Sequence, residues 1–176
     1  LFRRKVMKAM ESNDIHPLEG DVDIVATTVS IVESDKAGKK KRRKVKVLIG
    51  IERKSGGAAR SYVKVIGRAS KKKAKAFIDK KIDDEAMINM DETAQQCCYG
   101  HQIHHCEGLD KALDHRVVTT MLNWLYARHG YVTYIQDYLN EYCYRYNRHR
   151  MKGEILDDII TRMVRHEPMN RKLKVG

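Results

Sequence analysis

Three β-strand candidates follow one another between residues 21 and 68, and this run constrains the fold more than any other feature of the chain. Residues 21–32 are rich in Val, Ile and Thr, and residues 44–53 begin with clean alternation and then become apolar. Residues 60–68 follow the turn sequence Ser55-Gly56-Gly57. Because short connections join neighbouring strands of antiparallel sheets, we expect a three-strand antiparallel meander.

A helix and a fourth strand come next. Ser70 is the expected N-cap of a helix over 71–82. One face of that helix is apolar, with Ala74, Phe77, Ile78 and Ile82. Residues 85–90 form a short apolar strand that ends at Asp91, and we expect it to lie beside strand 21–32. The expected fold class is α/β, a mixed sheet made of the antiparallel meander plus one parallel strand, with flanking helices.

The remaining segments indicate helices at 112–128, 131–148 and 154–166. The tyrosines of the second and Trp124 have the spacing of core residues rather than of base-stacking residues. With 176 residues and 42% hydrophobic content, the chain can bury one core. We therefore expect an N-terminal helix and loop (1–20), one main domain (21–150), and a C-terminal helix with a basic tail (151–176).

The charge of the chain favours a nucleic-acid partner. Thirty-five Lys and Arg stand against 23 Asp and Glu, which gives a net charge of +12. Such an excess is typical of nucleic-acid binders, although a solvated basic surface without a partner is the alternative. No apolar run approaches the ~18 residues that a membrane-spanning helix needs, so we expect no membrane partner.

Two segments concentrate the positive charge. The first resembles a nuclear localisation signal, and we expect it at the tip of the hairpin between the first two strands, where it can contact phosphates or remain a solvated loop. The second lies on the helix that follows the meander. The predicted nucleic-acid-binding residues are Lys39, Lys40, Lys41, Arg42, Arg43 and Lys44 in the first segment, and Lys71, Lys72, Lys73 and Lys75 in the second.

The cysteines and the first ten residues bear on compartment and metal binding. Cys97, Cys98, Cys106 and Cys143 lack the spacing of a secreted disulfide scaffold, which favours a reducing compartment. The Cys- and His-rich segment 97–106 does not match a common zinc module, so we interpret it as a loop with partly buried cysteines and no metal. Residues 1–10 are basic and amphipathic, either the remainder of an organellar targeting region or a surface helix. The protein is expected inside the cell, with the mitochondrion favoured over the nucleus.

Four motifs, taken in order, resemble a known family. They are Met7-Lys8-Ala9-Met10, the PLEGDVDI sequence at 17–24, Met90-Asp91-Glu92, and the YLNEYCYRYNR sequence at 138–148. Together they resemble the insertion-sequence transposases with a ribonuclease-H-like catalytic domain, which are related to eukaryotic Merlin elements. The last motif is the most specific, because that family ends its domain with a helix close to YLxEFxxRxNR. The resemblance implies a ribonuclease-H-like fold over nearly the whole chain.

The same resemblance implies that two of three catalytic positions are degenerate. In the family the first strand carries a catalytic Asp, and Val25 stands at that place here. The second acid is present as Asp91, and the third position falls near Thr120, where no acid is found. Asp23 is two residues from Val25, about 7 Å along the strand, which is too far to replace the lost ligand. Because two metal ions need several oxygen ligands, these vestigial positions predict an inactive site with no bound metal and no cofactor.

These observations lead to one main hypothesis and two rivals. The main one is a domesticated, catalytically inactive transposase-like domain that binds nucleic acid or acts as an architectural component of a larger assembly, such as an organellar ribosome, beside other proteins. The first rival is an active metal-dependent DNA transposase or nuclease that uses Asp91. The second is a protein-only scaffold whose charge serves acidic partners. RNA and DNA are not distinguished, because both offer the same phosphate contacts.

Overall fold

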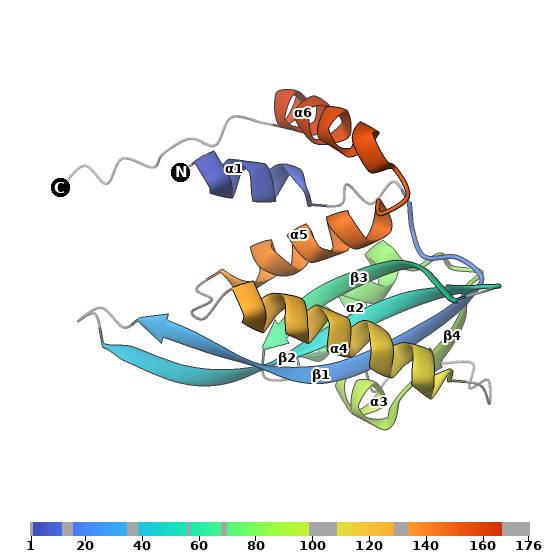
Figure 1. Ribbon diagram of the computed structural model, residues 1–176. Coiled ribbons are helices and arrows are strands. Elements are labelled where there is room, and N and C mark those ends of the chain that lie inside the picture. The colour runs from blue at the N-terminus through green and yellow to red at the C-terminus, as the bar shows by residue number, and fades with distance from the viewer. Residues whose placement is uncertain are drawn as a thin grey trace.

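The chain forms a four-stranded mixed sheet with helices on both faces (Figure 1). The computed structural model describes residues 2–11, 16–34, 39–55, 57–67, 70–98, 109–128 and 134–166. The strands are β1 (Asp21–Ser34), β2 (Lys40–Lys54), β3 (Gly57–Gly67) and β4 (Met87–Met90), in the spatial order β3-β2-β1-β4. β1 with β2 and β2 with β3 are antiparallel, whereas β1 with β4 is parallel. The predicted meander and its parallel fourth strand are therefore confirmed.

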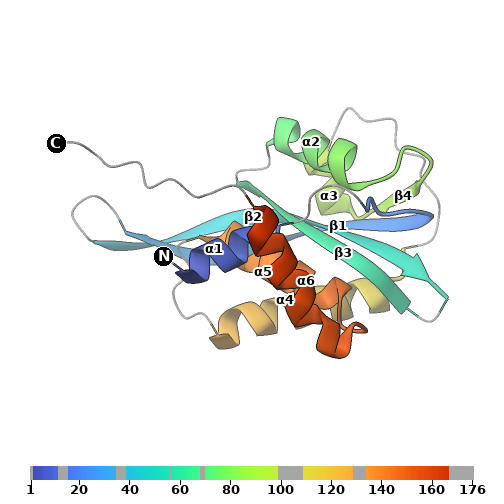
Figure 2. The ribbon, with the colours of Figure 1, turned by 90° about the horizontal axis from the view of Figure 1, so that it is seen from above.

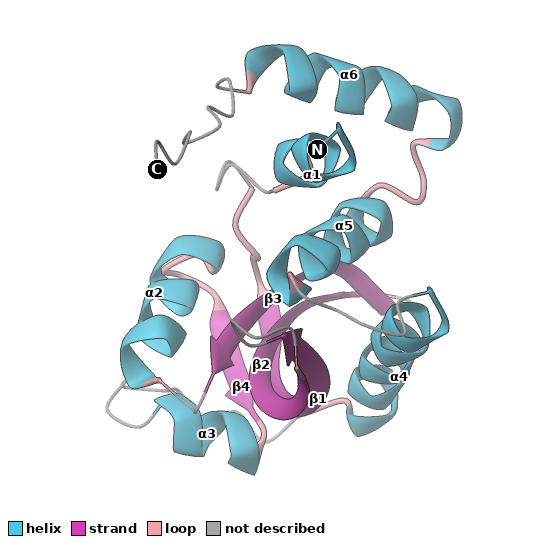
Figure 3. Ribbon diagram, turned by 90° about the vertical axis from the view of Figure 1, so that its left-hand side faces the viewer, coloured by secondary structure: helices cyan, strands magenta, loops and turns pink. Residues whose placement is uncertain are grey.

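The helices form two layers and an outer pair. They are α1 (Phe2–Ala9), α2 (Lys71–Lys81), α3 (Glu92–Cys98), α4 (Lys111–Arg128), α5 (Ile135–Asn147), the short 3-10 helix η1 (Lys152–Glu154) and α6 (Ile155–Arg165). Figure 3 shows α2 and α3 on one side of the sheet, α4 and α5 on the other, and α1 and α6 stacked outside α5. In the described part of the chain, no helix is both long and apolar enough to cross a membrane.

The residue numbers of β1 and β2 alternate between the two faces, as a strand period of two requires. Gly50 marks the α2 face, because a Cβ added there would lie 3.5 Å from the Phe77 ring and 2.8 Å from Leu18 Cδ1. Even-numbered residues of β1 and β2 therefore point toward α2 and α3, and odd-numbered residues toward α4 and α5. Both faces are buried under helices, so central β2 is apolar over the continuous run from Val47 to Ile51.

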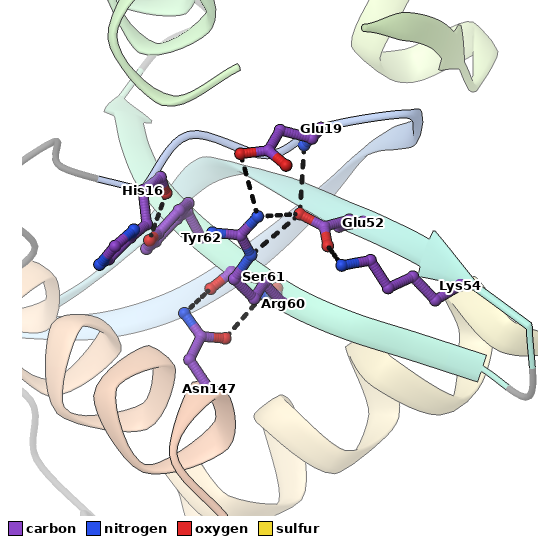
Figure 4. Close-up of polar contacts among 8 residues, drawn as sticks. All are labelled: His16, Glu19, Glu52, Lys54, Arg60, Ser61, Tyr62 and Asn147. Atoms are coloured by element: carbon purple, nitrogen blue, oxygen red, sulfur yellow. Dashed lines mark hydrogen bonds and ion pairs between the residues drawn. The ribbon is translucent and has the colours of Figure 1, made fainter. Parts of the chain in front are cut away.

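Side-chain amides of α5 cover the outer edge of β3. The Gln136 amide accepts a hydrogen bond from Val65 N at 2.8 Å and donates one to Val63 O at 2.9 Å. The Asn147 amide does the same with Ser61, at 2.8 Å from its N and 3.0 Å to its O (Figure 4). Each amide thus occupies the place that the backbone of another strand would take, and the edge cannot recruit one there.

A buried carboxylate joins β2, β3 and the segment before β1 (Figure 4). Glu52 Oε2 accepts hydrogen bonds from Arg60 Nε at 2.9 Å and from Glu19 N at 3.1 Å, and Oε1 lies 3.1 Å from Lys54 Nζ. Burial alone would raise the pKa of the Glu52 carboxyl, but these donors lower it below its ordinary value. The network fixes the entry of the chain into β1.

The first two strands continue together beyond the rest of the sheet. The pairing of β3 with β2 ends at Lys46, and the pairing of β4 with β1 ends at Ile24. The pairs from Val29 with Val45 to Ser34 with Lys40 therefore form a two-stranded ribbon, which Figures 1 and 2 show running past the ends of β3 and β4. We call this part of β1 and β2 the ribbon.

The ribbon corrects the prediction of a basic hairpin tip. Lys40 to Lys44 lie within β2 and pair with β1, and only Lys39 precedes the strand. The prediction was wrong because a run of charged residues hides the strand pattern. The side chains from Lys40 to Lys44 are exposed, so this part of β2 tolerates charge on both faces. Residues 35–38, between the two strands, lie outside the described residues.

Three further expectations are refined. Ser70 precedes α2 as predicted, but its side chain makes no capping hydrogen bond. Cys97 and Cys98 lie in helix α3, not in a loop as predicted. The Tyr-rich helix begins at Ile135 in the described part of the chain. Tyr142 and Tyr144 are buried as expected of core residues, whereas Tyr134, just before the helix, is 52% exposed, so the prediction was wrong there.

Candidate functional site

Asp91 lies immediately after β4 and is bound to the middle of β1. Its backbone N donates to Ile24 O at 3.1 Å, and its carboxylate accepts a hydrogen bond from Ala26 N at 3.3 Å. The same oxygen, Oδ1, accepts a hydrogen bond from Ala94 N at 2.6 Å, as expected of an N-cap of α3. Burial raises the pKa of the Asp91 carboxyl, although both backbone donors oppose that shift.

The other two positions that the resemblance implies, Val25 and Thr120, supply no carboxylate beside Asp91. Val25 adjoins Ala26 on β1 and is buried in the core. Thr120 is exposed on α4, where its hydroxyl donates to Arg116 O at 2.7 Å within the same helix. The structure thus brings Asp91 next to Val25 and leaves Thr120 bonded within its own helix.

This donor set does not fit the two metal ions that the resemblance implies. Such ions need several free oxygen ligands, whereas Asp91 Oδ1 already accepts two backbone hydrogen bonds and Val25 offers none. Among the described residues, no group of three or more His, Cys, Asp or Glu side chains is placed to hold a metal.

Sequence reasoning missed a buried polar cluster around Asp23. This carboxylate is 0% exposed, and Asn89 Nδ2 donates to its Oδ1 at 3.0 Å. Arg53 Nε lies 3.3 Å from Oδ2, and the buried Asp114 carboxyl lies near enough for the charge of Asp23 to raise its pKa. The cluster therefore joins β1, β2 and β4 to the start of α4, where Asp110 accepts a hydrogen bond from Leu113 N at 3.0 Å.

Two carboxyl groups so close together cannot both ionise easily. Burial, then the charges of Asp23 and Asp110, raises the pKa of Asp114 to about 7. Burial also raises the pKa of Asp23, against the opposing influence of Asn89 and Arg53. Asp23 is therefore engaged in contacts within this buried cluster. In the sequence, the position of Asp23 within the apolar stretch 22–25 was the signal that could have indicated this buried polar cluster.

The ribbon carries positive charge on both faces. Lys40, Arg42 and Lys44 have even numbers and lie on the α2 side, where Ser30 and Val32 are the cross-strand neighbours of Lys44 and Arg42. Lys41 and Arg43 lie on the opposite face. All five side chains are exposed, as is Lys39.

Helix α2 continues the basic surface on the same side of the sheet. Its first turn begins shortly after β3 ends at Gly67, which pairs with Lys46 at the base of the ribbon (Figure 2). The first turn contains no acid. The predicted binding residues Lys71, Lys72, Lys73 and Lys75 are all exposed. The structure thus brings the two predicted segments to one face. We call the three even-numbered ribbon residues, together with these four lysines, the basic face.

The described cysteines are buried thiols. Cys97, Cys98 and Cys143 are free, and burial raises the pKa of Cys98 to about 11 and that of Cys143 to about 12. Thiols held in the protonated form are poor nucleophiles and poor metal ligands. Residues 99–108, including Cys106 and the neighbouring histidines, lie outside the described residues.

Comparison with protein-family models, with curated proteins and with solved structures found no match to this chain.

Proposed function

We propose that this chain is a ribonuclease-H-like, transposase-derived domain that has lost catalysis and binds nucleic acid as an architectural component of a larger assembly. An organellar ribonucleoprotein is a natural setting for such a domain. The four motifs of the sequence support the family, and the βββαβ order with a parallel β4 beside β1 is compatible with it.

The observation that carries the binding proposal is the basic face. The major groove of B-form DNA is wide enough to admit a two-stranded antiparallel ribbon. On RNA, the same basic residues can contact the phosphates of the backbone. Lys71, Lys72 and Lys73 stand at the N-terminus of α2, where the helix dipole already favours negative charge. The three lysines therefore repel the positive end of the helix dipole and one another. A phosphate backbone bound there would relieve this repulsion.

The loss of catalysis is inferred from chemistry at the vestigial positions. Val25 and Thr120 have no carboxylate, and the Asp91 carboxylate holds the start of α3 against β1. An active nuclease would have to use Asp91 with other ligands. Manganese-dependent cleavage by the parent that disappears in Asp91→Asn would therefore overturn this part of the proposal.

The binding test compares the two faces of the ribbon with equal changes of charge. Arg42→Ala with Lys44→Ala removes two charges from the basic face, and Lys41→Ala with Arg43→Ala removes two from the opposite face. We expect the first pair to weaken binding to both an RNA and a DNA oligonucleotide, and to reduce the slope of log affinity against log salt by about 1.4–1.8. The second pair should retain the parental slope.

The same titrations separate the proposal from its scaffold rival. If neither oligonucleotide binds while polyglutamate does, the positive charge serves acidic proteins and the nucleic-acid proposal is wrong. Equal losses in the two double variants would show that charge matters but that the basic face is not the surface. The melting temperatures should stay close to that of the parent, because exposed substitutions usually change stability by less than about 0.5 kcal/mol each.

A further inference from the structure

A cavity of about 90 Å³ lies where β3 and α5 meet α2 and the segment after α1. None of the residues of the basic face lines it. A single water needs ~10–15 Å³ of such space, so the cavity has room for several waters or one small polyatomic anion. Four of the side chains that line it are cationic, Lys64, Lys81, Arg148 and Arg162, and one is a carboxylate, Glu11. That carboxylate also lies 3.7 Å from Lys8 Nζ. The walls therefore carry an excess of positive charge.

Two of these cations share one carboxylate. Arg148 Nε and Arg162 Nε each lie 2.9 Å from Asp158 Oδ2, which also accepts a hydrogen bond from the Tyr144 hydroxyl at 2.7 Å. The two guanidinium groups lie over the Tyr144 ring, 4.4 and 5.6 Å from its centroid. Their orientation is thus fixed by contacts within the protein, and one positive charge is left over at the cavity wall.

Two residues that line the cavity each hold a buried hydrogen-bond donor without an acceptor. Arg162 Nη1 and Asn140 Nδ2 have no hydrogen-bond partner among the described residues. Gln136 Nε2 donates to Asn140 Oδ1 at 2.8 Å, and this contact holds the Asn140 amide in place. A buried donor left unpaired is costly, more so on a charged group, so an acceptor beside these two donors would stabilise this wall.

We propose that this cavity is a binding site for a phosphate group. Arg162 and Asn140 would donate hydrogen bonds to its oxygens, and Lys64 and Lys81 would add charge. A phosphate fits this wall because it presents several acceptor oxygens and a negative charge at once. The group can come from free phosphate or a mononucleotide, or from the end of a nucleic-acid strand, and the site does not depend on the ribbon.

The key variant is Asn140→Asp, with Asn123→Asp as its matched control. Asn140→Asp retains the oxygen that accepts from Gln136 but replaces the donor with a negatively charged acceptor. Asn123 is exposed on α4, away from the cavity lining, so its replacement makes the same change of charge elsewhere. Lys64→Met is a second variant, which removes charge from the cavity without adding any, in case Asn140→Asp does not fold.

Calorimetry with inorganic phosphate, at an ionic strength held constant with chloride, measures binding to the full chain. We expect saturable binding that weakens at least about tenfold in Asn140→Asp, the equivalent of ~1.4 kcal/mol, and stays near the parental value in Asn123→Asp. No binding beyond that of chloride, or equal binding by the parent, Asn140→Asp and Lys64→Met, would show that the cavity holds only water and would overturn the proposal.

Competition experiments then distinguish the two sources of phosphate. A 5′-mononucleotide that competes as well as a 5′-phosphorylated oligonucleotide indicates a free ligand, whereas much tighter competition by the oligonucleotide indicates a strand end. The ribbon variants test the nucleic-acid surface separately, so failure of one proposal leaves the other standing.

Discussion

Asp114 of α4 lies beside Asp23 of β1, and burial together with the charge of Asp23 favours the protonated Asp114 carboxyl. The unfolded chain releases such a proton near pH 4, whereas the folded chain retains it up to a pH of about 7, the pKa of Asp114. Between these values the folded state binds the extra proton. The free energy of unfolding contributed by this group therefore falls as the pH rises through the window.

Asp114→Asn should remove this dependence, since an amide stays uncharged beside Asp23 at every pH. We expect the variant to be more stable than the parent at pH 8, by on the order of 1–3 kcal/mol, and to differ little at pH 4. Urea denaturation at several pH values measures the effect. Asp84→Asn, at an exposed site, serves as the control and should follow the parental profile. A variant that loses stability as the pH rises as steeply as the parent would contradict the raised pKa of Asp114.

Glu52 should show the opposite dependence on pH. The lowered pKa of its carboxyl means that its contribution to stability is present above pH ~4.5 and is lost as the pH falls through the folded value. Glu52→Gln should therefore destabilise the protein at pH 7, by about 3–5 kcal/mol, because Arg60 loses its buried partner. The difference from the parent should shrink toward pH 3, and a difference that grows there would refute the assignment.

The structural role of Asp91 predicts a loss of stability. Asp91→Ala removes the acceptor of the Ala94 and Ala26 hydrogen bonds, so we expect about 1–2 kcal/mol of destabilisation in thermal or urea unfolding. Asp91→Asn retains one oxygen and should lose less. The exposed neighbour Glu92 provides the control, as Glu92→Gln leaves both contacts intact. Equal stability of Asp91→Ala and the parent would mean that this carboxylate is kept for another purpose.

Opening the β3 edge should cause association as well as destabilisation. Gln136→Met keeps the length of the side chain but leaves Val65 N and Val63 O without partners, at a cost of about 1–3 kcal/mol. Light scattering at rising protein concentration should then show larger species than in the parent. Gln96→Met, exposed on α3, makes the same chemical change away from any edge and should remain like the parent.

Gly50 is required by close packing rather than by a turn. A Cβ at this position would lie 2.8 Å from Leu18 Cδ1, so Gly50→Ala should destabilise the protein by about 1–3 kcal/mol through overpacking. Leu18→Ala in the same chain would make room for the new methyl group, so the two changes together should cost less than the sum of their separate effects. Simple additivity in urea unfolding would argue against the close approach of Leu18 to β2.

The sheet could be predicted from the sequence because its strands have a local pattern. Alternation in 44–53, the turn at Ser55-Gly56-Gly57 and the apolar run before Asp91 are each visible within a short window. The charged half of β2 could not be recognised in that way, because its strand state depends on pairing with β1. The seven-residue helix α3 was missed since so short a helix leaves little periodic signal.

The candidate sites were likewise predictable only where a local sequence pattern marks them. The basic residues could be identified from the sequence, but their arrangement on one face follows from strand register and from the place where α2 begins. The contact between Asp23 and Asn89 spans 66 residues, and that between Gln136 and Val65 spans 71. Such partners become visible only when the chain is folded, because no local pattern records them.

The side-chain amides of Gln136 and Asn147 that cover the β3 edge can be lost by slow chemical deamidation. Deamidation turns an amide, which both donates and accepts, into a carboxylate that only accepts. At Asn147 the new charge would face the Ser61 carbonyl oxygen that the amide now binds, and the repulsion would loosen α5 from the sheet. Molecules with an exposed β3 edge would thus accumulate with the age of the protein, by chemical change alone.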